Sequence, residues 1–173
     1  MTVWFTSDQH FDHPFMSKTF RGFSRTSKHD DQLIRDWNDV VLRGDCVVVL
    51  GDVFWTNYQH ITAIWGQLNG SKILVKGNHD HIWLKPTKGL SHHIIYEHKY
   101  KVKGGKQHIV ACHFPMLSWN KKVHGALHVH GHSHGALPPD WHRMDVGVDV
   151  AKVMFGTYRP FSLEEIIYLL KEI

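Results

Sequence analysis

The 173 residues carry a formal net charge of +4 and 42% of them are hydrophobic, which is typical of one globular domain over residues 1–173 and excludes a disordered chain. No apolar run approaches the length of a membrane span and no signal-like segment opens the chain, so we expect a cytoplasmic protein with no membrane partner. The Lys and Arg residues are scattered, apart from a loose group at 99–106, and indicate no clear nucleic-acid-binding surface.

Short apolar segments recur along the chain, and each runs into residues that can bind a metal ion. These predicted strands and the polar residues after them are VWFTS with Asp8 and His10, CVVVL with Asp52, KILVK with Asn78 and His79, HIVAC with His113, and ALHVH with His132 and His134. Between the early strands, residues 29–42 and 58–68 have the apolar spacing of helices. Alternating strands and helices predict an α/β fold, in which polar residues gather beyond the carboxyl ends of the strands.

The second half of the chain has a different pattern. Strands are expected within 94–112, with a hairpin-like turn at Gly104 and Gly105, and near 142–149 and 153–158. Ser162 and Glu165 have the spacing of a capping box and predict a final helix after Pro160. No repeat or linker separates this half from the first, which favours a single domain.

The stretch HVHGHSHG at 128–135 belongs either to a metal-buffering tract or to a built site with partners elsewhere. Asp, Asn and His together offer hard oxygen and borderline nitrogen, a mixture suited to Mn²⁺, Fe or Zn²⁺. In an extended segment, Asp8 and His10 would point to the same side and bind one ion together. Glycines before Asp52, Asn78 and His132 would let the backbone turn tightly. The partners elsewhere in the chain favour a built site.

The ordered set DxH at 8–10, GD at 51–52, GNHD at 77–80, His113 and GHxH at 131–134 resembles the calcineurin-like metallophosphoesterase superfamily. The resemblance covers about residues 3–150 and is greatest to small, cap-less bacterial and phage members. It implies a sandwich of two mixed β-sheets flanked by helices. It also implies two divalent metal ions, with Mn²⁺ favoured and Fe, Zn²⁺ or Ni²⁺ as alternatives.

The resemblance also implies a role for each matching residue. Asp8, His10, Asp52 and His134 would hold one ion, and Asp52, Asn78, His113 and His132 would hold the second. The carboxylate of Asp52 would bridge the two ions, and a hydroxide bridging them would attack phosphorus in line. His79 is not a ligand in the family pattern and would protonate the leaving oxygen. Asp80 would orient the imidazole of His79.

Several further residues have two interpretations. Asn78, His13 and Arg21 are candidate substrate contacts. Arg21, with Arg25, lies in a loop that could fold over the metals and clamp a phosphate oxygen, or it is a solvated charge. Phe54, Trp55, Trp83 and Trp119 are interpreted as core or rim residues, although one of them could stack on a base. His81, His128 and His130 are structural, or they support the site. Asp145 and Asp149 are interpreted as polar residues on a core strand.

The favoured function is hydrolysis of small or cyclic nucleotide-type phosphodiesters. A phosphomonoesterase and, after it, a nuclease are the enzymatic alternatives, and a metal-storage or metal-sensing protein is the non-enzymatic one. The pair His79 and Asp80 favours an enzyme, because a storage site needs neither residue. The sequence leaves the native metal, the substrate and the oligomeric state open.

Overall fold

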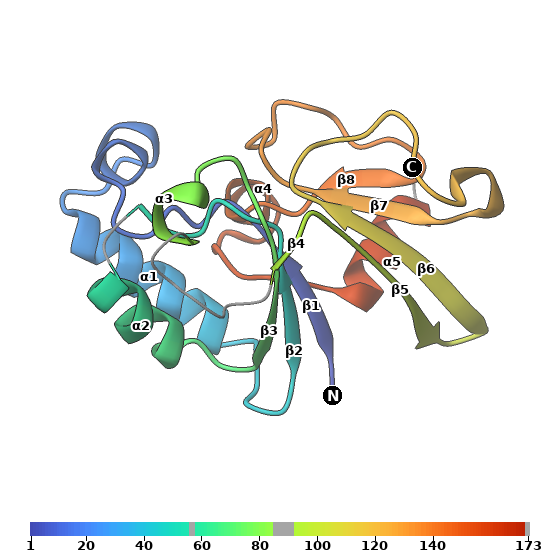
Figure 1. Cartoon of the computed structure of the whole chain (residues 1–173), viewed down its shortest axis with the longest axis horizontal. Helices are drawn as coiled ribbons and strands as arrows, with labels where there is room; N and C mark the ends of the chain where they lie inside the picture. The colour runs from blue at the N-terminus through green and yellow to red at the C-terminus, as the bar shows by residue number, and fades with distance from the viewer. Residues whose placement is uncertain (56–57, 85–91, 172–173) are drawn as a thin grey trace.

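A computed structural model of the chain describes residues 1–55, 58–84 and 92–171 and contains two β-sheets that face each other (Figure 1). In the first sheet, with strand order β4-β3-β2-β1-β9, the parallel strands are β1 (Val3–Thr6), β2 (Cys46–Val49), β3 (Ser71–Val75) and β4 (His92–His93), and the antiparallel strand is β9 (Phe161–Ser162). In the second sheet β5 (Ile95–Val102) is antiparallel to β6 (Gly105–Cys112), and β7 (Leu127–His130) and β8 (Arg143–Asp145) continue it in parallel. Both sheets are mixed, which confirms the expected fold class.

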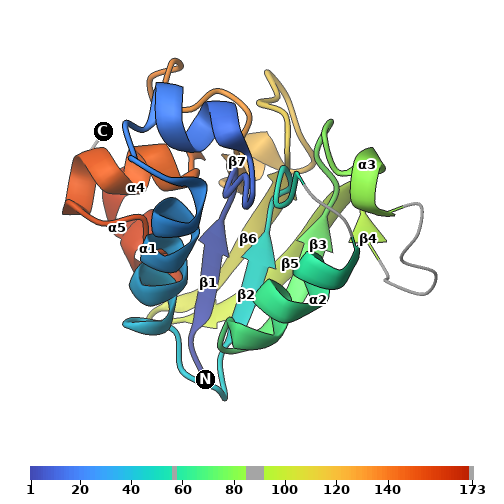
Figure 2. The ribbon, with the colours of Figure 1, turned by 90° about the vertical axis from the view of Figure 1, so that its left-hand side faces the viewer.

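The helices flank the two sheets. They are the π-helix η1 (Phe15–Phe20), α1 (Thr26–Asn38), α2 (Tyr58–Gln67), α3 (His81–Leu84), the 3₁₀ helix η2 (Lys122–His124), α4 (Val148–Phe155) and α5 (Leu163–Lys171). Figure 2 shows α1 and α2 in front of the first sheet, with the second sheet behind it. Within the described part of the chain, no helix combines the length and the apolar character needed to cross a membrane.

Both faces of the first sheet are buried, and β2 illustrates why its sequence is continuously apolar. Val48 packs with Ile109 and Val129 in the core between the two sheets. Val47 and Val49, on the opposite face of the same strand, belong to the core that includes α1 and α2. A strand covered on both sides needs apolar residues at every position, not at alternate ones. Burying each valine side chain contributes about 1.5–3 kcal/mol.

Most predicted elements are present, and one segment differs. The helix expected at 58–68 is α2, and the helix expected at 29–42 is α1, which begins and ends a few residues earlier. The capping box also forms: Ser162 N donates to the carboxylate of Glu165, and Glu165 N donates to Ser162 Oγ. The strand expected at 142–149 forms only at 143–145, and the strand expected at 153–158 is wrong.

Half of the wrong segment, residues 153–155, lies in helix α4, which covers 148–155. In this helix Val148 and Val150 alternate as in a strand, but Val148 and Ala151 are buried three residues apart, as on a helix face. Gly156, with φ of 75°, follows it as a left-handed helix end. Burial of one helical face therefore outweighs the strand propensity of valine here.

Candidate metal centre

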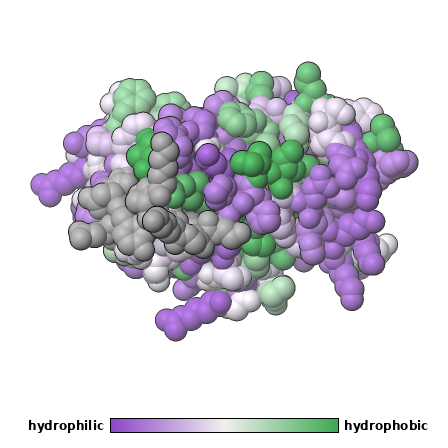
Figure 3. Space-filling model, viewed as in Figure 1, coloured by the Kyte–Doolittle hydropathy of each residue, from purple (hydrophilic) through white to green (hydrophobic). Residues whose placement is uncertain are grey.

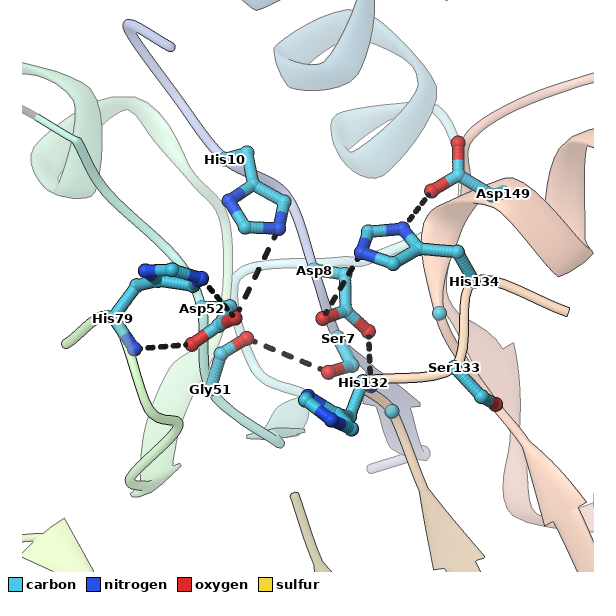
Figure 4. Close-up of polar contacts among 12 residues, drawn as sticks. Ser7, Asp8, His10, Gly51, Asp52, His79, His132, Ser133, His134 and Asp149 are labelled. Carbon is cyan, nitrogen blue, oxygen red and sulfur yellow. Dashed lines mark hydrogen bonds and ion pairs between the residues drawn. The ribbon is translucent and has the colours of Figure 1, made fainter. Parts of the chain in front are cut away.

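The predicted metal ligands come together where five strands end, and Figure 4 labels Asp8, His10, Asp52, His132 and His134 among them. Strands β1, β2 and β3 of the first sheet and β6 and β7 of the second each lead into one ligand-bearing loop. These loops carry Asp8, His10, Asp52, Asn78, His113, His132 and His134. The order of motifs in the sequence thus corresponds to a single place in the fold.

The ligands form two groups. Asp8, His10 and His134 have ligand atoms within 4.8 Å of one another, and so do Asp52, His113 and His132. Asp52 Oδ2 lies 3.5 Å from His113 Nε2 in its own group and 3.9 Å from His10 Nε2 in the other. Each group could hold a metal ion.

Asn78 extends the second group. His113 Nε2 lies 2.9 Å from Asn78 Oδ1, so the amide oxygen already faces the nitrogen with which it would share an ion.

Two buried polar atoms of the first group have no hydrogen-bond partner among the described residues, namely Asp8 Oδ1 and His10 Nε2. Asp8 is fully buried and His10 is 3% exposed. A buried polar atom without a partner costs about 1–3 kcal/mol, and native proteins rarely contain one. A divalent cation would satisfy the carboxylate oxygen and the imidazole nitrogen at once. The residues present therefore fit a metal ion.

Five of the ligand residues have a left-handed backbone. Asp8, His10, Asp52, His132 and His134 have φ between 47° and 68°. The expectation that Asp8 and His10 lie in an extended segment is therefore wrong, because β1 ends at Thr6. This conformation costs about 1 kcal/mol or more for a residue with a side chain. Hydrogen bonds between loops offset part of the cost, such as Asp8 N to Gly51 O at 3.0 Å and His10 N to Asp52 O at 3.0 Å.

The glycines at these loops allow a close approach of one loop to another, as expected. A Cβ on Gly131 would collide with Ser7 Oγ and would lie 2.5 Å from Asp8 Oδ2. A Cβ on Gly77 would likewise overlap the carboxylate of Asp52. Any side chain at either position would therefore push a ligand out of place.

Burial and pairing set the charges of the ligands. Burial raises the pKa of Asp8 to about 7 and lowers the pKa of His10 to about 2. For Asp52 and His113 burial is again the largest single effect and acts in the same directions, but their attraction for each other and for other neighbours together outweighs it. The balance lowers the pKa of Asp52 to about 2 and raises the pKa of His113 to about 9.

His113 is therefore an imidazolium when no ion is bound. Its Nδ1 donates to Leu50 O at 2.7 Å, and its Nε2 donates to Asn78 Oδ1. A metal ion must displace the proton on Nε2 before it can bind there.

Asp149 orients the imidazole of His134, and Arg21 in turn holds Asp149. His134 Nδ1 donates to Asp149 Oδ2 at 2.7 Å, which leaves Nε2 free to face Asp8 Oδ1 at 4.0 Å. The guanidinium of Arg21 donates to both oxygens of Asp149, at 2.8 and 2.7 Å. Although burial opposes it, the hydrogen bonds from His134 and Arg21 hold the pKa of Asp149 well below its usual range. The sequence interpretation missed this role, since Asp149 lies on α4 and is separated from Arg21 by 128 residues.

The prediction that Arg21 clamps a phosphate is wrong. Besides Asp149, its N–H groups face Asp8 O at 2.7 Å, Gln9 O at 2.8 Å and His29 Nε2 at 2.8 Å. These contacts use all five N–H groups of a guanidinium, and the side chain is only 2% exposed. Arg21 has no donor left for a substrate.

The prediction that Asp80 orients His79 is also wrong. Asp80 is fully buried, and its carboxylate accepts four hydrogen bonds, from the backbone N–H groups of residues 52, 53 and 77 and from Trp83 Nε1, at 2.7–3.0 Å. It ties the loop after β2 to the loop after β3. His79 is instead held by its backbone N–H, which donates to Asp52 Oδ1 at 2.9 Å, and its side chain is 40% exposed.

His13 and Trp55 lie beside the site. Their rings have centroids 4.3 Å apart, His13 lies edge to face with His10, and Trp55 with His79. Trp55 is 37% exposed, whereas Phe54, Trp83 and Trp119 are buried, so only Trp55 of the four aromatic candidates borders the site. His13 lies beside the first ligand group, and its contact with a substrate stays a prediction. Burial lowers the pKa of its imidazole.

The remaining candidates support the backbone. His128 and His130 are buried, and their Nδ1 atoms donate to Val110 O and Gly131 O at 2.9 Å. Asp145 lies on β8 as expected, and its Oδ2 accepts hydrogen bonds from Ser133 Oγ at 2.7 Å and Gly135 N at 3.0 Å. It thereby fixes the turn that carries His132 and His134.

The chain is similar to proteins from phages, archaea and bacteria. It is 28% identical to an uncharacterized protein of Methanocaldococcus jannaschii, over 98% of this chain and 92% of that protein. It is 26% identical to the Gene 66 protein of Mycobacterium phage L5, over 85% of this chain and 86% of the phage protein. A crystal structure of a protein of unknown function from Aquifex aeolicus superposes with a TM-score of 0.68 at 21% identity, covering 97% of this chain and 98% of that one. No model of a known protein family matches the chain. The Aquifex protein shares the fold, and the function has to follow from the chemistry of the site.

Proposed function

We propose that the protein is a phosphoester hydrolase that uses two divalent metal ions and acts on phosphodiesters of the small or cyclic nucleotide type. The observation that carries the proposal is the position of Asp52 between two ligand groups. Its Oδ2 faces His113 Nε2 at 3.5 Å and His10 Nε2 at 3.9 Å. One carboxylate oxygen is thus within reach of both groups, as a bridging ligand has to be.

The ligand assignment follows from this position. Asp8, His10, Asp52 and His134 would hold one ion, and Asp52, Asn78, His113 and His132 the other. When bound, two such ions polarise phosphoryl oxygens and lower the pKa of a water molecule between them. The mixture of carboxylate, amide and imidazole ligands favours Mn²⁺, with Fe, Zn²⁺ or Ni²⁺ as alternatives.

His79 would donate a proton to the leaving oxygen. Its Nε2 lies 3.9 Å from Asp52 Oδ2, and its half-exposed ring is open to a substrate. Contact with Trp55, with ring centroids 5.2 Å apart, limits the rotation of the ring. Asp52 fixes the backbone of His79, so the imidazole is positioned without Asp80.

The test compares His79→Asn with His132→Asn on an aryl and an alkyl phosphodiester. An aryl leaving group departs with little assistance, whereas an alkoxide needs a proton. We expect His79→Asn to reduce kcat/KM by about 10²–10⁴-fold on the alkyl ester and clearly less on the aryl ester. We expect His132→Asn to lower bound metal and to reduce activity on both esters alike.

Metal content and kcat/KM of both variants distinguish the outcomes. Equal losses on the two esters for His79→Asn, or loss of a metal ion from it, would show that His79 positions metal or phosphate. A wild-type protein that binds two ions but hydrolyses neither ester would be a metal-binding protein rather than an enzyme.

The state of Arg21 favours diesters over monoesters. A monoester dianion gains from a second cationic group at the metal centre, and the guanidinium nearest the ligands is fully engaged by Asp149 and backbone carbonyls. We therefore expect bis-p-nitrophenyl phosphate to be hydrolysed faster than p-nitrophenyl phosphate. Robust monoester hydrolysis without diester hydrolysis would reverse the assignment.

A further inference from the structure

A hollow of about 310 Å³ opens beside the candidate metal centre, where β3 and β6 end. The described residues that line it include Lys76, Asn78, His81, Ile94, Cys112 and Phe114. Asn78 belongs both to this hollow and to the second ligand group, because its Oδ1 accepts a hydrogen bond from His113. A group bound in the hollow would therefore be adjacent to a phosphoryl group bound at the metal centre.

Phe114 and Ile94 give the hollow apolar walls that are open to solvent. Phe114 is 45% exposed and Ile94 is 63% exposed. Figure 3 shows hydrophobic side chains gathered near the middle of this face, where β5 begins in Figure 1. The Phe114 ring also contacts His113 and His132, with centroid distances of 5.0 and 4.8 Å, so its position is fixed relative to the ligands. A planar organic group could stack on this ring.

Lys76 and His81 add a donor and an acceptor to these walls. Lys76 lines the hollow, and its ammonium group would donate to a ligand bound there. His81 Nδ1 donates to Asn78 O at 2.7 Å, which leaves Nε2 of the neutral ring as an acceptor. The edge of a nucleobase presents acceptors and donors side by side, next to a flat apolar face.

We infer that this hollow binds the base of a nucleoside attached to the phosphoester, so that the substrates are nucleoside phosphodiesters. The inference rests on the proposed function for the identity of the reacting group. It adds a location for the organic part of the substrate, with Phe114 stacking on the base and Lys76 and His81 bonding its edge. A pocket of this volume is at the lower end of the range that small ligands occupy.

Binding to the metal-free protein tests the inference without catalysis. Saturation-transfer NMR is recorded with adenosine, guanosine, cytidine and uridine 5′-monophosphates, and we expect signals from the base protons of at least one. Stacking of a base on an aromatic side chain strengthens binding by about 5- to 150-fold. Phe114→Ala should therefore abolish the base signals. Phe20→Ala is the matched control, because the Phe20 ring is 53% exposed and lies beside His134, on the other ligand group.

Hydrolysis by the Mn²⁺-loaded protein gives the second readout. The p-nitrophenyl phosphodiester of the best-bound nucleoside is compared with methyl p-nitrophenyl phosphate, which has the same charge and leaving group. We expect a KM about tenfold lower for the nucleoside ester, a difference that Phe114→Ala removes and Phe20→Ala retains.

The outcomes separate the two proposals. Hydrolysis of neither ester, with base signals that depend on Phe114, would contradict the proposed hydrolase and leave the nucleoside site supported. Hydrolysis of both esters with equal KM, and no base signal from any of the four nucleotides, would overturn the nucleoside site and leave the hydrolase supported. Base signals lost in Phe20→Ala and retained in Phe114→Ala would also overturn the site.

Discussion

At the scale of single residues, Asp149 determines which nitrogen of His134 is available to a metal ion. Its carboxylate accepts the Nδ1 proton at 2.7 Å, and so Nε2 carries the lone pair. We expect Asp149→Asn to weaken binding of the ion in the first ligand group by about 10- to 100-fold, because an amide neither fixes the tautomer nor increases the basicity of the ring as strongly. The measurement is competition with a chromophoric chelator. Asp140→Asn serves as a control, since Asp140 pairs with Arg143 outside the ligand groups. Equal affinities in the two variants would contradict the role.

Asp80 acts on stability and not on proton transfer. Its buried carboxylate accepts four N–H groups, three of them from the backbone of two ligand loops. We expect Asp80→Asn to lower the free energy of unfolding of the metal-free protein by about 3 kcal/mol, because the new amide NH₂ faces donors. Urea denaturation measures the loss. Any remaining activity should fall equally on aryl and alkyl esters. A selective loss on alkyl esters would show that Asp80 does act through His79.

At the scale of elements, the strand ends were predictable because their signals are contiguous in the sequence. Each ligand, such as Asp52 or His113, directly follows an apolar strand, and the sheet order then brings these ends together. Helix α4 was not predictable from its valines, and with it the position of Asp149 was missed. The link from Asp149 to Arg21 joins residues far apart in sequence, so no local pattern reports it.

The loops after β7 and β1 can approach each other closely because residue 131 is a glycine and has no side chain. Gly131 leaves no room for a Cβ beside Ser7 and Asp8. We expect Gly131→Ala to displace the loop with His132 and His134, to lower the unfolding free energy by about 1–3 kcal/mol and to reduce metal occupancy. Elemental analysis and thermal denaturation measure the two effects. Gly44→Ala is the matched control, since a Cβ at Gly44 would meet no described atom within 4 Å. Wild-type occupancy in Gly131→Ala would contradict the packing argument.

At the scale of the whole molecule, stability and metal binding should respond oppositely to pH. The pKa of His113 is raised from 6.5 to about 9 in the metal-free fold, so its proton stabilises the fold fully below pH 6.5. This contribution, on the order of 3 kcal/mol, is lost as pH rises from 6.5 to about 9. An ion replaces the same proton, so metal affinity should rise over that window by up to about tenfold per pH unit.

Denaturation of metal-free and Mn²⁺-loaded protein at several pH values across this window checks the prediction. The metal-free midpoint should fall with pH, and the loaded one should not. His113→Asn, which cannot titrate, should reduce the fall in the metal-free midpoint. A metal-free midpoint that stays constant across this range would show that His113 is not charged in the fold.

Because the candidate ligands follow strands of two different sheets, they leave the ribosome at different times during synthesis. Asp8 and His10 leave the ribosome early and Asp52 and Asn78 follow, but His113, His132 and His134 lie in loops after β6 and β7, which are made much later. The first sheet alone offers an incomplete set of oxygen and nitrogen donors, which an ion would occupy only weakly. We therefore expect tight metal binding only after β7 has emerged and packed, so that the nascent chain would take up little metal before its domain has folded.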